Sequence, residues 1–390
     1  MIGRREFIGC TVGAMALPVF DAFALETLAS GSGRLVVLFL RGGLDGLFAI
    51  APVSDPRLPE FRPTLSEAVR ATGIRLETTG FSAYPSCKAL ADLFAARELA
   101  FAPCAGTTDR SRSHFQAQDV FELGSGSTHG SSGFMARAAQ LLGGGRGAIS
   151  FTRDVPLAFQ GGDRVPEVAP LSGSGLRLPD GRMLQAIRRA HHHTRTGEAL
   201  EQAISTEAQI EAALGMEPQA ARGAPGAGDL EKVAANLGQI LRGSPRLTLS
   251  FLDLGGMDTH ANEEAVLTRT ASAIGDGLQA LKRALGEAEW RRTRVAVMSE
   301  FGRTARENGT RGTDHGNGGL FLLAGGAING GRMIGDFKGL SEPGLNENRD
   351  LPVLADWRAL LGACMRDTFG LSDAGLDIVF PGRPRQKFLI

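Results

Sequence analysis

Short apolar runs alternate with amphipathic stretches along this chain. Residues 35–40 are continuously apolar, which is typical of a central parallel strand that is covered on both faces. Comparable runs predict four further strands, at residues 99–103, 247–254, 295–298 and 320–323. Helices are predicted after the runs at 99–103 and 247–254, one reaching Leu123 with Ser113 as its N-cap and one reaching about Gly286.

This alternation predicts an α/β fold with a mostly parallel central sheet and helices on both faces. The pattern changes between about residues 180 and 243, where polar helical sequence is interrupted at 218–228. We interpret that stretch as a helical insertion rather than as a separate domain. Residues 35–390 are therefore expected to form a single α/β domain.

The first 24 residues have the pattern of a targeting segment. Arg4 and Arg5 precede an apolar run at residues 8–20, and the small-residue pattern around Ala24 follows it. We interpret residues 1–24 as a twin-arginine-type signal peptide and 25–34 as a linker, with an ordinary secretory signal or a misassigned start site as alternatives. This predicts a periplasmic or secreted protein that uses the twin-arginine export machinery. The mature form contains no apolar stretch of the roughly 20 residues that a membrane span requires.

Composition excludes several classes of protein. The chain has 42 Lys and Arg against 42 Asp and Glu, so no basic excess favours nucleic acid or an anionic membrane as a partner. Glycine is abundant, at 53 of 390 residues, but it follows no collagen-like period. After the signal, Cys87, Cys104 and Cys364 remain, which permits at most one disulfide.

Carboxylates and imidazoles follow successive predicted strands. Because ligands bind at the carboxyl ends of the strands in open α/β sheets, we expect these side chains to share one metal site. Zinc is the first choice, with manganese, magnesium or calcium as alternatives. Each residue also has a plain structural interpretation, such as a turn bond for Asp45 or a helix cap for Ser113. The candidate metal ligands are Asp45, Asp258, His260, Glu300, Asp314 and His315.

Five sequence blocks resemble those of a known family. They are RGGLDGL at 41–47, SHFQAQ at 113–118, DTH at 258–260, SEFGRT at 299–304 and GTDHG at 312–316. With them the chain resembles the domain-of-unknown-function family 1501 of exported bacterial proteins, which is grouped with the alkaline phosphatase and sulfatase superfamily. The resemblance covers essentially the mature chain.

The resemblance implies an alkaline-phosphatase-like three-layer sandwich with a divalent metal site. It places metal ligands at Asp45, Asp258, His260, Glu300 and His315 and a nucleophile at Ser113, with His114 beside it. A helix that begins there would favour a bound phosphate or sulfate. Arg41, Arg112 and Arg303 are candidates for binding substrate oxygens.

The chain also departs from the superfamily pattern. Only one residue separates Asp258 from His260, where the superfamily has three, and Phe301 stands where a metal-binding His is usual. The Cys/Ser-x-Pro-x-Arg block of sulfatases is absent, which argues against an oxidised cysteine nucleophile. These departures predict a one-metal or altered site.

The resulting hypothesis is an exported, metal-dependent hydrolase-like protein that acts on a phosphate-type or related ester of a small molecule or polymer. The alternative is a catalytically inactive superfamily member that serves as an envelope binding or assembly protein. A third possibility is metal carriage without turnover. The positions of the strand-end side chains relative to one another distinguish a metal site from a set of unrelated turns.

Overall fold

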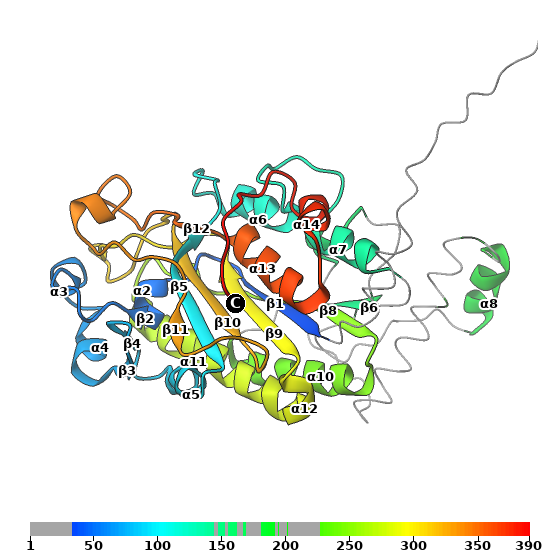
Figure 1. The fold of residues 1–390 in the computed structure, drawn as a ribbon, viewed down its shortest axis with the longest axis horizontal. Helices are drawn as coiled ribbons and strands as arrows, with labels where there is room; N and C mark the ends of the chain where they lie inside the picture. Colours follow the sequence, from blue (N-terminus) through cyan, green and yellow to red (C-terminus); the bar gives the residue numbers. More distant parts are fainter. Residues whose placement is uncertain are drawn as a thin grey trace, which may run out of the picture.

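The computed structural model describes residues 33–143, 147–152, 155–161, 167–168, 181–191, 194, 201 and 227–390. The predicted signal peptide and nearly all of the predicted linker lie outside these residues. A nine-stranded sheet occupies the centre of the described part (Figure 1). Its strands are β1 (Arg34–Leu40), β5 (Leu99–Gly106), β6 (Gly147–Phe151), β7 (Glu167–Val168), β8 (Leu247–Leu254), β9 (Thr293–Ser299), β10 (Gly319–Ala324), β11 (Arg332–Met333) and β12 (Ala355–Asp356).

The sheet is mostly parallel, as the sequence predicted, and all five predicted strands are present. The strand order is β11-β5-β10-β9-β1-β8-β6-β7, with β12 beside β5. Strand β1 pairs in parallel with β8 and β9, whereas β10 runs antiparallel to both β9 and β5. The start of β10 therefore lies at the edge where β1, β5, β8 and β9 end. This brings the segment before β10 to the same edge as the loops that follow the parallel strands.

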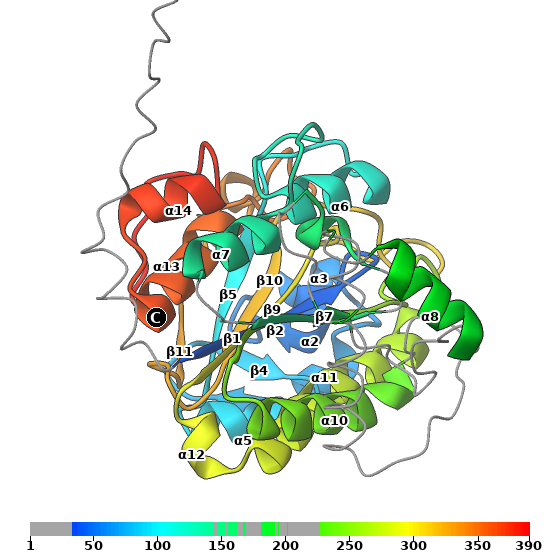
Figure 2. The same ribbon diagram turned by 90° about the vertical axis from the view of Figure 1, so that its right-hand side faces the viewer.

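Helices cover both faces of the sheet (Figures 1 and 2). Alternate residues of β1 enter two separate apolar clusters, with Leu38 in one and Phe39 in the other. The first cluster includes residues of α5 (Lys88–Ala95), α10 (Leu230–Gly243), α11 (Glu263–Leu285) and α12 (Glu287–Trp290). The second includes residues of α6 (His114–Leu123), α7 (Phe134–Leu142), α13 (Trp357–Phe369) and α14 (Asp373–Val379).

A small antiparallel sheet lies beside the main one and was not predicted. Its order is β2 (Ile50–Ala51), β4 (Phe81–Ala83), β3 (Ile74–Leu76). Short helices accompany it, and they are α2 (Gly46–Ala49), α3 (Leu58–Phe61) and α4 (Glu67–Thr72). The remaining helical elements of the described residues are α8 (Gly181–Ala190) and the 3-10 turns η2 (Leu157–Phe159), η3 (Ala227–Asp229) and η4 (Glu342–Gly344).

The stretch expected to form a helical insertion contains α8 and α10. Helix α10 packs along α11 and buries Leu237 and Leu241 in the first apolar cluster, so this helix belongs to the layer that covers the sheet. Most of the sequence between α8 and α10 lies outside the described residues.

The three cysteines of the described part, Cys87, Cys104 and Cys364, are buried free thiols, and burial raises the pKa of each to about 12. Among the helices of the described ranges, none is long and apolar enough to cross a membrane.

Candidate metal centre

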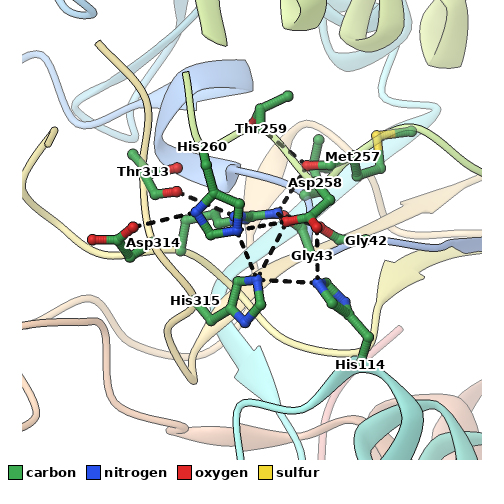
Figure 3. Close-up of polar contacts among 12 residues, drawn as sticks. Gly42, Gly43, His114, Met257, Asp258, Thr259, His260, Thr313, Asp314 and His315 are labelled. Carbon is green, nitrogen blue, oxygen red and sulfur yellow. Dashed lines mark hydrogen bonds and ion pairs between the residues drawn. The ribbon is translucent and has the colours of Figure 1, made fainter. Parts of the chain in front are cut away.

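Three imidazoles and one carboxylate converge at the carboxyl edge of the sheet (Figure 3). His114 is the first residue of α6, Asp258 and His260 follow β8, and His315 precedes β10. The Nε2 atom of His315 lies 3.1 Å from Nε2 of His114 and 3.0 Å from Nε2 of His260. Asp258 Oδ1 lies 3.0 Å from His260 Nε2 and 3.3 Å from His315 Nε2, and its Oδ2 lies 3.4 Å from His114 Nε2. We call these four residues the His/Asp cluster.

Each histidine of the cluster is oriented through its other ring nitrogen. His114 Nδ1 lies 2.7 Å from Glu300 Oε1, and His260 Nδ1 lies 3.2 Å from Asp314 Oδ1. The Nδ1 atom of His315 lies 2.8 Å from the backbone carbonyl of Arg112. Because each of these partners accepts a hydrogen bond, Nδ1 carries the proton and the Nε2 lone pair faces the cluster. Such outer acceptors are the usual partners of metal-binding histidines.

The cluster fits a divalent metal. Three Nε2 lone pairs and a carboxylate that face one another repel unless a cation or protons lie between them. Zinc bound tetrahedrally at 2.0–2.1 Å separates its ligand atoms by about 3.3 Å. The five separations given above span 3.0–3.4 Å, and the ligand atoms of His114, Asp258 and His315 form a group of metal-binding size. The single residue between Asp258 and His260 therefore does not keep their side chains apart.

Arg303 holds the Asp258 carboxylate in place. Its Nη2 donates to Asp258 Oδ1 at 2.7 Å, and its other contacts are to the backbone carbonyls of Gly42, Gly43, Met257 and Thr313. Burial raises the pKa of Asp258, but the hydrogen bond and charge of Arg303 outweigh burial and lower it to about 2. The Arg303 side chain is fully buried. It therefore holds the carboxylate ionised and does not face a substrate, which corrects its predicted role.

Glu300 supports His114 and lies outside the cluster. Burial raises the pKa of its carboxylate, yet hydrogen bonds from His114 and Gln118 lower it below its usual value. The same hydrogen bond to Glu300 is the main cause of the raised pKa of His114. Besides the contact with His114, the Glu300 carboxylate accepts hydrogen bonds from Gly42 N at 2.9 Å, Gly43 N at 3.2 Å, Gln118 Nε2 at 2.9 Å and Ser299 Oγ at 2.9 Å. Both oxygens are thus engaged, so the structure gives Glu300 an orienting role in place of the predicted ligand role.

Two glycines allow the loop after β1 to reach Glu300. Gly42 and Gly43 have φ values of +112° and +68°, which side chains other than glycine rarely adopt. A Cβ at Gly42 would lie 2.7 Å from the backbone nitrogen of Asp258, and one at Gly43 would lie 2.6 Å from Phe301 Cε2. The glycine-rich block therefore allows the close approach of three loops.

Asp45 does not join the cluster, contrary to the prediction. Its carboxylate forms a buried, two-pronged ion pair with Arg62, whose Nη2 lies 3.0 Å from Asp45 Oδ1, and it caps α2 through Leu47 N at 3.1 Å. Burial raises the pKa of Asp45, but the charge of Arg62 opposes burial and the pKa is lowered overall. Arg62 also donates to the carbonyls of Thr304 and Ala305. Sequence reasoning missed Arg62, because nothing in the local pattern around it indicates a buried partner.

Phe301 forms an apolar wall beneath two imidazoles. Its ring centroid lies 4.8 Å from that of His114 and 5.0 Å from that of His315. An imidazole at this position would offer a further nitrogen ligand, whereas a phenyl ring packs the two histidines and offers none. This arrangement favours a single metal ion.

Arg41 and Arg112 have different surroundings. Arg41 donates to Asp253 at 2.7 Å, Gln118 at 2.9 Å and Glu122 at 2.9 Å, so each of its three nitrogens has a partner, and its side chain is 25 % exposed. A substrate-binding role for Arg41 remains a prediction. Arg112 bonds Glu347 and Asp350 through Nη2, and its side chain is 28 % exposed beside the cluster.

Ser113 occupies the predicted N-cap position of α6, but its side chain makes no capping hydrogen bond. Its backbone N–H donates to Ser111 Oγ at 3.2 Å. The nucleophile role remains a prediction.

Fold and cluster together define a mixed α/β protein with a candidate metal centre at the strand ends. The family model described as "Protein of unknown function (DUF1501)" matches residues 98–379, and the chain belongs to this family. The comparison with curated proteins found no match.

Two solved structures show similarity to the chain. One is Ps i-CgsB in complex with k-i-k-neocarrahexaose, with a TM-score of 0.42 and 11 % identity over 89 % of this chain and 74 % of that one. The other is the C-terminal periplasmic domain of EcEptC from Escherichia coli in complex with Zn, with a TM-score of 0.41 and 10 % identity over 91 % of this chain and 88 % of that one. At such TM-scores these similarities do not establish a shared fold.

Proposed function

We propose that this protein is an exported hydrolase that depends on one divalent metal ion, zinc being the first choice. The observation that carries the proposal is the convergence of three Nε2 atoms on one carboxylate, with every Nδ1 held by an outer acceptor. This donor set and its spacing suit zinc better than magnesium or calcium, which prefer oxygen ligands.

Asp258, His260 and His315 would hold the ion, and His114 faces the same point. An ion there would polarise an ester oxygen and stabilise negative charge on the transferring group. Arg112 is the arginine best placed to bind a substrate oxygen, because its side chain is partly exposed and its carbonyl contacts His315. Ser113, next to His114, is the candidate nucleophile. A phosphate-type or related ester is the proposed substrate.

Membership of the alkaline phosphatase and sulfatase superfamily is part of the same proposal. The mostly parallel sheet with helices on both faces supports it. The proposed export rests on the paired arginines and apolar run within residues 1–24, which precede the described part of the chain.

Metal content and ester cleavage test the proposal directly. The purified protein should contain about one zinc per chain by mass spectrometry, and it should cleave at least one member of a panel of phosphomonoesters, phosphodiesters and sulfate esters. The His315→Ala variant should lose both properties. His129→Ala removes an exposed histidine elsewhere and should retain both. A folded wild-type protein that neither binds metal nor cleaves any ester contradicts the proposal.

A second candidate is metal retention without turnover. It is favoured by the number of side chains in the cluster, since four protein ligands are typical of structural zinc sites. Metal at one ion per chain with no cleavage of any ester would select this candidate.

A further inference from the structure

Three members of the His/Asp cluster belong to one tightly joined pair of loops. The loop after β8 carries Asp258 and His260, and the loop before β10 carries His315. The carbonyl of His260 accepts hydrogen bonds from Thr310 Oγ1 at 2.7 Å and Asn308 Nδ2 at 3.0 Å. In the same pair of loops, Thr313 N donates to Thr259 O at 3.2 Å. These three side chains therefore form one preorganised set.

His114 reaches the cluster from a separate segment. It begins α6, and the residues that connect β5 to α6 are exposed or partly exposed from Thr108 onward. The contact between Arg112 O and His315 Nδ1 links this segment to the loop pair. His114 Nε2 lies 3.4 Å from Asp258 Oδ2, whereas His260 and His315 face Oδ1 of the same carboxylate at 3.0 Å and 3.3 Å.

Catalytic zinc sites usually have three protein ligands and one open position, whereas structural sites have four protein ligands. Asp258, His260 and His315 of the loop pair alone would give three ligands and an open position, as in a catalytic site. His114 would add the fourth ligand that is typical of a structural site. Glu300 holds His114 from the other side of its ring, and Glu300 is itself fixed by backbone and side-chain donors. His114 thus has a firm anchor that does not depend on the metal.

We propose that His114 is an exchangeable fourth ligand, which closes the metal site at rest and gives up its place to an oxygen of an anionic ligand. This inference rests on the proposed metal binding and deepens it. After the exchange, the bond to Glu300 keeps His114 beside the site, where Nε2 can form a hydrogen bond with the incoming group. The His114 side chain would then control the access of substrate to the metal site.

The test uses cobalt(II)-loaded full-length protein and inorganic phosphate as the probe. Each coordinated imidazole has an Nδ1–H held by an acceptor, and each should give one exchangeable, strongly shifted proton resonance. We expect three such resonances without phosphate and two when phosphate is saturating. His114→Ala should show two in both conditions and bind phosphate about tenfold more tightly, if the native site is closed about nine-tenths of the time.

Phe115→Ala is the matched control, since Phe115 follows His114 in α6 and its side chain is 85 % exposed. It should behave as the wild type does. Two resonances in the wild type before phosphate is added, or three that persist with phosphate bound, overturn the inference while leaving metal binding intact. Failure of the folded wild type to take up cobalt or zinc overturns the proposed function and this inference together. The wild-type titration decides the matter even if His114→Ala does not fold.

Discussion

Glu263, the first residue of α11, has a buried carboxyl group that is expected to be protonated at neutral pH. It is 0 % exposed and accepts a hydrogen bond from Thr313 Oγ1 at 2.7 Å. Burial, followed by the neighbouring charge of Asp45, raises the pKa of Glu263 to about 9. Glu263 and Asp45 together thus carry one negative charge, which the buried Arg62 balances.

Because Glu263 keeps its proton in the folded state, the free energy of unfolding should depend on pH. An unfolded Glu releases its proton above about pH 4.3, whereas the folded one keeps it, so the free energy of unfolding should decrease as the pH rises from 5 to 9. The slope from one such group approaches about 1.4 kcal/mol per pH unit. Glu263→Gln, which stays neutral, should flatten this dependence in urea denaturation at pH 5 and pH 8. An unchanged slope in Glu263→Gln, with the exposed Glu67→Gln as reference, would contradict the assignment.

Asp314 orients His260 without reaching the cluster itself. Removal of such an outer partner typically lowers metal affinity by about 10- to 100-fold. Because Asp314 is more than half exposed, water compensates in part, and we expect about a tenfold loss for Asp314→Ala. Competition against a chromophoric chelator measures the affinity. Asp92→Ala, at an exposed position on α5, should leave it unchanged, and an equal affinity in both variants would refute the role of Asp314.

At the scale of elements, the loop after β9 and the start of β10 touch at Gly302. A Cβ there would lie 1.9 Å from the carbonyl oxygen of Gly318, and Gly302 also exchanges backbone hydrogen bonds with Gly316 and Asn317. Gly302→Ala must therefore push the two segments apart and displace Arg303 and His315 with them.

We expect Gly302→Ala to lower the free energy of unfolding by about 1–3 kcal/mol and to reduce the metal content of the purified protein. Thermal unfolding and mass spectrometry measure the two effects. Gly309→Ala is the control, because a Cβ at Gly309 meets nothing within 4 Å. Similar metal content in the two variants would show that this contact does not position the cluster.

The sequence predicted the long strands well and the direction of β10 not at all. Apolar runs of four to eight residues mark a strand that is buried on both faces, and all five runs form strands. The two- and three-residue strands β2, β3, β4, β7, β11 and β12 are too short to produce a period. Strand direction is set by the chain's path through space, so the reversal that brings His315 to the site leaves no local trace.

Candidate site residues were predictable by type and position, but not by role. Asp258, His260 and His315 lie close together, and their role as metal ligands stays a prediction. Asp45 and Glu300 also lie after strands, yet distant partners decide what they do. Arg62 occupies the Asp45 carboxylate, and backbone N–H groups of the β1 loop occupy Glu300. Such long-range pairings are invisible in the local pattern of a single sequence.

At the scale of the whole molecule, the His/Asp cluster joins segments that follow β5 and β8 and precede β10. A ligand that binds only the folded state stabilises it by about 2.7 kcal/mol at a free concentration of 100 times its dissociation constant. We expect a chelator to lower the melting temperature of the wild type and restored zinc to recover it, as followed by differential scanning fluorimetry. His315→Ala should show no response to either treatment. An equal response in both proteins would mean that the metal acts elsewhere.

The two consecutive N–H groups at Gly42 and Gly43 form a concavity of the kind that binds anions, and the protein's own Glu300 fills it. A negatively charged substrate therefore finds no vacant main-chain donors in this loop. Under the proposed function, its countercharge would come from the metal ion and from Arg112. Chelation would then remove the principal attraction for an anion along with the ion, and weak residual binding at the exposed part of Arg112 should depend on ionic strength.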